Sequence, residues 1–255
     1  MEMLVVAATA LTAALLTFFT GFGLGTILMP AFALFVPLPD AVAMTALVHL
    51  VNGFVKLGLV ARHVAWRVVL VFGLPAVAGA LVGAWLLRSL AGAAPLATWS
   101  AGGHVFAVTP AKLVVGVLLA VFALAEFLPA AKRIAIPPRW FALGGVLSGF
   151  FGGLAGMQGA LRSAFLVRAG FTKEQYVGTG AAIACLVDLT RLGVYLPALR
   201  AAAPDPRVLG AALVAALAGT LLGTLLLAKV PFRFVERLVA CVLLAFAAGL
   251  AVGAL

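Results

Sequence analysis

The chain has 255 residues, of which 65% are hydrophobic and only 9% are charged. A soluble domain needs more polar residues than this to cover its surface, so the composition excludes that class and indicates a polytopic, all-α membrane protein. In a soluble protein, the formal net charge of +10 would suggest a nucleic-acid partner. Here the cations flank apolar segments, where basic loops set membrane orientation, and we expect no nucleic acid.

Eight hydrophobic segments are separated by proline, glycine and charged residues. In chain order they cover about 3–36, 40–61, 64–88, 109–128, 139–169, 174–197, 207–228 and 233–254. The first and fifth, at 34 and 31 residues, are longer than a ~30 Å hydrocarbon core requires at ~1.5 Å per residue. Each contains a glycine-rich interruption, TGFGLG in the first and GFFGGLAGMQG in the fifth. We therefore expect each to be a broken, re-entrant hairpin of two half-helices.

The two halves of the chain repeat one another. An offset of 133 residues aligns Gly23 with Gly156, and single-residue gaps then pair Lys56 with Arg191. Four segments fall in each half, which indicates a duplicated unit. The pattern predicts a first repeat over 1–128, a linker over 129–138 and a second repeat over 139–255.

The basic residues predict how the repeats are oriented. Fourteen of the 17 lysines and arginines lie near segment ends. If all eight segments simply crossed the membrane, each side would carry seven, which contradicts the positive-inside rule. If the first and fifth segments instead enter and leave on the same side, the division becomes ten against four. The sequence thus predicts six crossings, two inverted repeats and both termini outside.

Charged residues inside the apolar segments indicate the function. Lys56, Arg162 and Arg191 lie there, and only Asp188 is clearly buried beside them. A charge at the bilayer centre costs roughly 2.5–3.5 kcal/mol on insertion scales, so it is seldom retained without a polar partner or a function. Asp188 and Arg191, three positions apart, are interpreted as a structural ion pair in preference to a ligand pair. The cationic excess predicts that the interior handles an anion.

A polar stripe follows the second segment. Thr45, His49, Asn52 and Lys56 recur at spacings of four, three and four, which places them on one helical face. Lys56 has no acidic residue within four positions, which favours a binding role. His49 has two interpretations, a helix-packing histidine or part of a proton relay. Arg162 also has two, since it either marks the site or extends to the lipid headgroups.

The broken segments add backbone groups to the predicted site. Half-helix N-termini offer free amides and a partial positive charge to an anion. The predicted substrate site combines these breaks with the polar side chains: Gly23, Gly25, Thr45, His49, Asn52, Lys56, Gly156, Gln158, Arg162, Ser163, Asp188 and Arg191. Cys185 and Cys241 lie in apolar segments without the spacing of metal ligands, and we expect neither a metal nor a cofactor.

The repeated glycine-rich break followed by Pro-Ala-Phe or Ser-Ala-Phe, with four segments per half and a cation on each second helix, resembles the TauE/SafE family of sulfite and organosulfonate transporters. The resemblance covers essentially the whole chain. It implies movement of sulfur-containing anions, mostly outward across the bacterial inner membrane. The second break departs from the family pattern, because Gln158, Arg162 and Ser163 stand where glycine, an apolar residue and proline are expected. We expect these three residues to influence which anion is bound.

The sequence therefore predicts a secondary transporter that moves a small inorganic or organic anion, such as sulfite or an organosulfonate, by alternating access. Its expected partners are that anion and membrane lipid, with protons as a candidate coupling ion and a homodimer as a candidate assembly. No ATP-binding loop occurs in the sequence, so a gradient or a separate subunit must supply the energy. Two alternatives stay open. One is a passive anion channel, and the other is a membrane-embedded enzyme that uses His49, Glu126 or Asp188.

Overall fold

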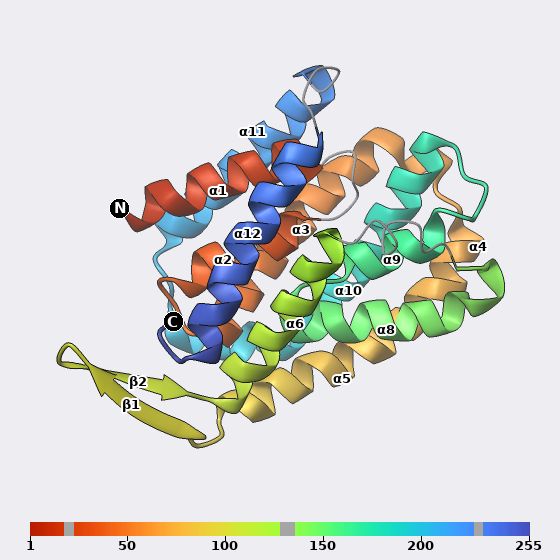
Figure 1. Ribbon diagram of the computed structural model, residues 1–255. Coiled ribbons are helices and arrows are strands. Elements are labelled where there is room, and N and C mark those ends of the chain that lie inside the picture. The colour runs from red at the N-terminus through yellow and green to blue at the C-terminus, as the bar shows by residue number, and fades with distance from the viewer. Residues whose placement is uncertain (18–22, 128–135, 227–231) are drawn as a thin grey trace.

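The computed structural model of the chain is described for every residue except 18–22, 128–135 and 227–231, which Figure 1 draws as a grey trace. Within the described residues the chain is helical apart from one β-hairpin (Figure 1). The predicted linker, 129–138, lies largely outside the described residues, as does the start of the first glycine-rich interruption.

The observed elements follow the predicted segments closely. The first half contains α1 (Glu2–Thr17), α2 (Leu24–Ala33), α3 (Leu38–Val60), η1 (Ala61–His63), α4 (Trp66–Val68), the π-helical turn η2 (Val69–Gly73), α5 (Leu74–Ala91), β1 (Ala97–Ala101), β2 (His104–Val108) and α6 (Pro110–Phe127). The second half contains η3 (Pro138–Trp140), α8 (Phe141–Ala155), α9 (Gly159–Leu166), α10 (Lys173–Ala202), α11 (Pro206–Leu226) and α12 (Phe232–Ala251). Each predicted segment corresponds to one helix or to a run of consecutive helices.

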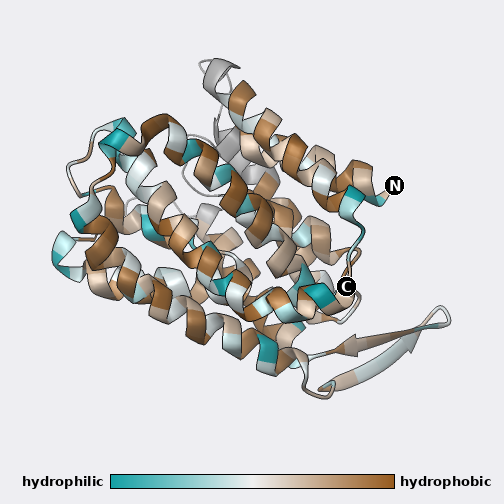
Figure 2. Cartoon of the chain, turned by 180° about the vertical axis from the view of Figure 1, so that it is seen from behind, coloured by the Kyte–Doolittle hydropathy of each residue, from teal (hydrophilic) through white to brown (hydrophobic). Residues whose placement is uncertain are grey.

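Four stretches of the described chain are long and apolar enough to cross a bilayer. They are Leu38–His63, Trp66–Ala91, Lys173–Ala202 and Pro206–Gly223, and they coincide with four of the six predicted crossings. The other two predicted crossings correspond to α6 and α12, in which the described apolar stretches are shorter. Hydrophobic residues run along the length of the helices (Figure 2), and large ones such as Trp85 and Val214 are exposed, as surfaces that face lipid require. The described helices fit a multi-pass membrane protein.

Glycines mark both predicted breaks. Gly156 ends α8 with a φ of 76°, a left-handed conformation that residues with a side chain rarely adopt. Gly23 immediately precedes α2 and has a φ of 122°. In each half the helix after the break contacts the helix before it, α2 on α1 and α9 on α8. The predicted division of the first and fifth segments into two helices is therefore confirmed.

The long helices of the two halves pack in a reciprocal pattern. α1 packs on α11 and α5 packs on α8, so the first segment of each half contacts the third segment of the other. α3 packs on α10 and α6 packs on α12, so the second and fourth segments contact their own counterparts. Figure 1 shows α5 and α8 lying alongside each other on one side of the bundle. This exchange of partners is what a two-fold relation between the halves would produce.

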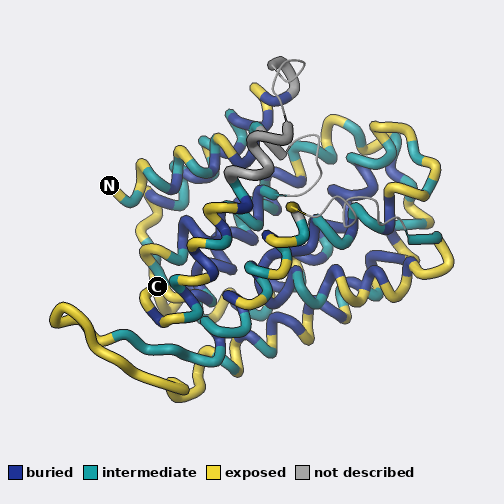
Figure 3. The backbone as a smooth tube through the Cα atoms, viewed as in Figure 1, coloured by how far each residue is buried: buried dark blue, intermediate teal, exposed yellow. Residues whose placement is uncertain are grey.

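The hairpin of β1 and β2 was not predicted from the sequence. Gly102 and Gly103 form its two-residue turn with φ values of 58° and 81°, which is the conformation that Gly-Gly favours in hairpins. The strands are exposed along much of their length (Figure 3). Trp99 holds them to the end of α12, because its Nε1 donates a hydrogen bond to the carbonyl oxygen of Val252 at 2.7 Å.

Glycines also allow α5 and α8 to approach closely. A β-carbon on Gly79 or Gly83 would overlap backbone carbonyl oxygens of α8. From the opposite side, a β-carbon on Gly149 would overlap the carbonyl oxygen of Ala76 in α5. A β-carbon on Gly219 of α11 would likewise overlap the carbonyl oxygen of Leu11 in α1. The small residues of these helices therefore serve packing, as is typical of helix contacts in membranes.

The close packing of α8 on α5 leads to the first prediction. Gly149→Ala is expected to lower the free energy of unfolding by about 1–3 kcal/mol, the usual cost of overpacking. Gly193→Ala is the matched control, because it makes the same change in α10 at a position where nothing lies within 4 Å. Thermal unfolding of the purified protein in detergent measures both variants. Equal melting temperatures would contradict the close approach of α5 and α8.

Candidate functional site

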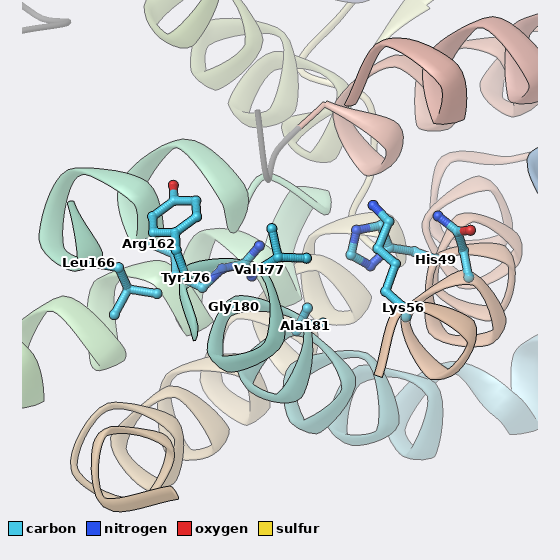
Figure 4. A pocket seen from close by; sticks show the side chains of 11 residues that line it. His49, Lys56, Arg162, Leu166, Tyr176, Val177, Gly180 and Ala181 are labelled. Atoms are coloured by element: carbon cyan, nitrogen blue, oxygen red, sulfur yellow. The ribbon is translucent and has the colours of Figure 1, made fainter. Parts of the chain in front are cut away.

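A small polar cavity lies between α3, α9 and α10. Its volume is about 40 Å³, roughly three times the ~10–15 Å³ that one water molecule requires. His49 and Lys56 of α3 lie on one side of it, and Arg162 of α9 and Tyr176 of α10 lie on the other (Figure 4). The described residues that line it include a lysine and an arginine, Lys56 and Arg162, and no aspartate or glutamate. The cavity therefore has the lining that an anion requires.

Three of the four residues in the predicted polar stripe reach this cavity. They are His49, Asn52 and Lys56. Asn52 is also fixed from α11, because Thr220 Oγ1 donates a hydrogen bond to its Oδ1 at 2.6 Å. Thr45 is buried one turn earlier and is not among the described lining residues. Its Oγ1 has no hydrogen-bond partner in the described part of the chain. The stripe thus contributes to the cavity from His49 onward.

Asp188 lies behind the cavity and is fully buried. Arg191 Nε donates a hydrogen bond to its Oδ1 at 2.9 Å, which gives the ion pair predicted from their spacing. The other oxygen, Oδ2, lies 2.5 Å from Nδ1 of His49. Arg191 Nη2 also lies 2.8 Å from Oδ1, although without the angle of a hydrogen bond. One carboxylate therefore joins α3 to α10.

Gln158 connects this carboxylate to the cavity. Its Nε2 donates to Asp188 Oδ1 at 3.1 Å, and its Oε1 accepts a hydrogen bond from Arg162 Nη1 at 3.0 Å. Its backbone oxygen accepts a hydrogen bond from Ser148 Oγ at 2.9 Å. Gln158 is 2% exposed and is not among the described lining residues. It positions Arg162 from behind the cavity wall.

The two arginines predicted to lie inside the apolar segments, Arg162 and Arg191, are both interior residues. Arg162 is 4% exposed, so its guanidinium does not extend to the headgroups. Arg191 is fully buried, and its Nη1 would lie 3.0 Å from a β-carbon on Gly156. Ser163 is half-buried on α9 and is not among the described residues at the cavity. Of the three residues that depart from the family pattern, only Arg162 therefore lines it.

The two glycine-rich breaks contact each other beside the cavity. A β-carbon on Gly25, in the first turn of α2, would lie 2.9 Å from the carbonyl oxygen of Gly156 and 3.9 Å from Cδ2 of His49. The first turn of α2 thus lies close to His49 and to the break that follows α8. Gly23 precedes α2 at the same junction.

Several polar residues of this network were missed. Tyr176, which lines the cavity, lies one turn into α10, just after the capping box formed by Thr172 and Gln175. Ser148 and Thr220 each carry one of the hydrogen bonds described above. The sequence offers only a weak signal for them, an isolated polar residue in an apolar segment. The side chain of Glu126 lies outside the described ones, and no group of three potential metal ligands occurs in the described part of the chain.

The fold and the cavity define a class of protein: a multi-pass helical membrane protein with an interior polar cavity that carries basic side chains. Comparison with protein families gives a match to the family described as sulfite exporter TauE/SafE over residues 6–250. The chain therefore belongs to the TauE/SafE family, as the sequence resemblance indicated. Searches of curated proteins and of solved structures gave no match. Membership implies a membrane transporter of sulfite or related anions, and members of the family are transporters rather than enzymes.

The burial of Asp188 leads to the second prediction. Asp188→Asn is expected to lower the free energy of unfolding by about 3–5 kcal/mol, because Arg191 would remain buried without a carboxylate. Asp205→Asn is the matched control, since Asp205 is exposed and an amide oxygen can still accept the hydrogen bond from the backbone nitrogen of Arg207. Unfolding by heat or by SDS measures both variants. An Asp188→Asn protein as stable as the control would show that the ion pair is not required.

Proposed function

We propose that the protein is a secondary transporter that exports a small sulfur-containing oxyanion across the bacterial inner membrane. The observation that carries the proposal is the presence of Lys56 and Arg162 on opposite sides of one interior cavity. Membranes rarely retain interior cations without a functional reason. Here two of them share a space large enough for a few heavy atoms. Family membership supports the same class of substrate.

The lining suits a compact oxyanion. Arg162 offers a planar guanidinium, whose fork matches the geometry of two oxygens on one anion. Lys56 offers a compact charge with rotatable donors. Asn52 can add a neutral donor, because the hydrogen bond from Thr220 occupies its oxygen and leaves its amide nitrogen available. A volume of about 40 Å³ favours sulfite or a small sulfonate over a bulky organic anion.

We further propose that residues 1–128 and 139–255 are inverted repeats joined by the linker 129–138. α3 and α10 occupy the same place in the two repeats, and they run antiparallel. A β-carbon on Gly53 would lie 2.7 Å from Sγ of Cys185, and one on Gly178 would lie 3.2 Å from the carbonyl oxygen of Val60. A two-fold axis that relates antiparallel helices is perpendicular to them, so it lies in the membrane plane when the helices cross the bilayer. The reciprocal packing of α1 on α11 and α5 on α8 supports the same axis.

This arrangement is the one on which alternating access operates in transporters built from inverted repeats. The cavity lies where the two repeats meet, because α3 belongs to the first and α9 and α10 to the second. Movement of the closely packed pair α5 and α8 against the closely packed pair α1 and α11 would expose the cavity to one side of the membrane at a time. We propose that a gradient drives this movement, since the sequence contains no ATP-binding loop.

The position of Lys56 leads to the third prediction. Lys56→Met is expected to weaken anion binding on the order of tenfold or more, the loss of one charge-assisted hydrogen bond. Lys112→Met is the matched control, because Lys112 is equally half-buried but donates to the carbonyl oxygen of Ala107 in the hairpin. Thermal stabilisation by sulfite, methanesulfonate, sulfate and acetate measures the affinity of each protein, since a ligand that binds the native state raises its stability. A folded Lys56→Met protein with unchanged affinity would refute the assignment.

A further inference from the structure

A histidine stands between the cavity and the buried carboxylate. His49 lines the cavity, while its Nδ1 lies 2.5 Å from Asp188 Oδ2. The side chain of His49 is 17% exposed, whereas that of Asp188 is fully buried. Arg191 holds the carboxylate in place from the same helix. The imidazole is therefore fixed at one nitrogen and borders the cavity.

This arrangement defines which nitrogen can exchange a proton. A carboxylate oxygen only accepts hydrogen bonds, so Nδ1 of His49 carries a hydrogen and donates it to Asp188. Nε2 is then the ring nitrogen that gains or loses the second proton. When it gains one, an N–H bond forms at Nε2 and the imidazole becomes a cation beside the cavity. When it loses one, the proton passes to water and the ring returns to its neutral form.

We propose that a proton is the co-substrate of the transporter and that His49 carries it together with the anion. This inference rests on the proposed function, because it requires an anion in the cavity. An anion in the cavity and a proton on His49 attract each other at short range, so each strengthens the binding of the other. The two therefore move in the same direction. In export the proton moves against its inward gradient, so the outward anion gradient and the membrane potential must drive the movement.

The charged groups around His49 come from three helices. Lys56 lies on its own helix, Arg162 faces it from α9, and Asp188 and Arg191 lie on α10. α2 contributes the backbone of Gly25 near Cδ2 of the ring. Lys56 and Arg162 repel a second proton on His49 when the cavity is empty, and a bound anion offsets this repulsion. Proton binding is thus linked to occupancy of the cavity.

Gln158 couples the two sites physically. It bonds Asp188 with its amide nitrogen and Arg162 with its amide oxygen, so the carboxylate that orients His49 and the guanidinium that faces the anion share one side chain. In a connected buried network, a change of charge at one member is transmitted to the others. Gln158 is therefore a positioning residue for both the proton site and the anion site.

The test measures the protons taken up when an anion binds. Sulfate and methanesulfonate are suitable probes, because neither takes up a proton of its own near neutral pH. Calorimetric titrations of the full-length protein in buffers with different ionisation enthalpies give the number of protons bound per anion. The wild-type protein is expected to take up a substantial fraction of one proton per anion near neutral pH.

The His49→Arg and His49→Gln proteins are both expected to take up no proton when the anion binds. His49→Arg still attracts the anion, because the arginine carries a permanent charge. His104→Gln on the exposed strand β2 is the matched control and should behave as wild type. If sulfite is the only anion that binds, the proton uptake of His49→Arg is subtracted from that of the wild type. This difference removes the protons that sulfite itself exchanges. Wild-type protein that binds the anion without proton uptake, or His49→Arg protein that still takes up protons, would overturn the proposal. Wild-type protein that binds no anion would instead refute the proposed function.

Discussion

The structure depends on one carboxylate that is kept fully buried in an apolar helical bundle. Asp188 needs several donors there, because an isolated charge in a membrane interior is too costly to retain. It obtains them from three places: Arg191 on its own helix, His49 on α3 and Gln158 at the start of α9. These contacts join α3 and α10, the second segments of the two halves, to the second glycine break. The cavity lies beside this junction, and Gln158 links the junction to Arg162 in the cavity wall.

Glycine supplies the second constraint, because it lets the backbones of neighbouring segments approach closely. Gly25 and Gly156 let the two breaks touch, and Gly149 lets α8 lie directly on α5. A β-carbon on Gly25 or Gly149 would overlap a backbone carbonyl oxygen of the facing segment. The packing of α5 on α8 and of α1 on α11 joins helices of the two halves in pairs, and the cavity lies between other helices, α3, α9 and α10.

Much of the fold and of the site could be predicted from the sequence, because a membrane restricts both. Hydrocarbon thickness limits helix length and penalises charge, so the segments, the two breaks and the interior cations Lys56, Arg162 and Arg191 follow from local patterns. The ion pair of Asp188 with Arg191 follows from their spacing on one helix. The contact of His49 with Asp188 spans 139 positions and depends on how α3 meets α10, so no local pattern predicts it. The same reason explains why Gln158 and Ser163 were expected at the cavity, whereas in the structure Gln158 supports its wall and Ser163 is not among the residues described there.

The most direct test of the account is to locate the bound anion. Selenite is the heavier analogue of sulfite, and its anomalous scattering identifies its position in a crystal without reference to the protein model. The account predicts one selenium peak in the cavity between Lys56 and Arg162, within hydrogen-bonding distance of both side chains. A peak elsewhere, for example in the surface groove beside Arg88 and Trp85, together with an empty cavity at a selenite concentration that saturates binding, would contradict it.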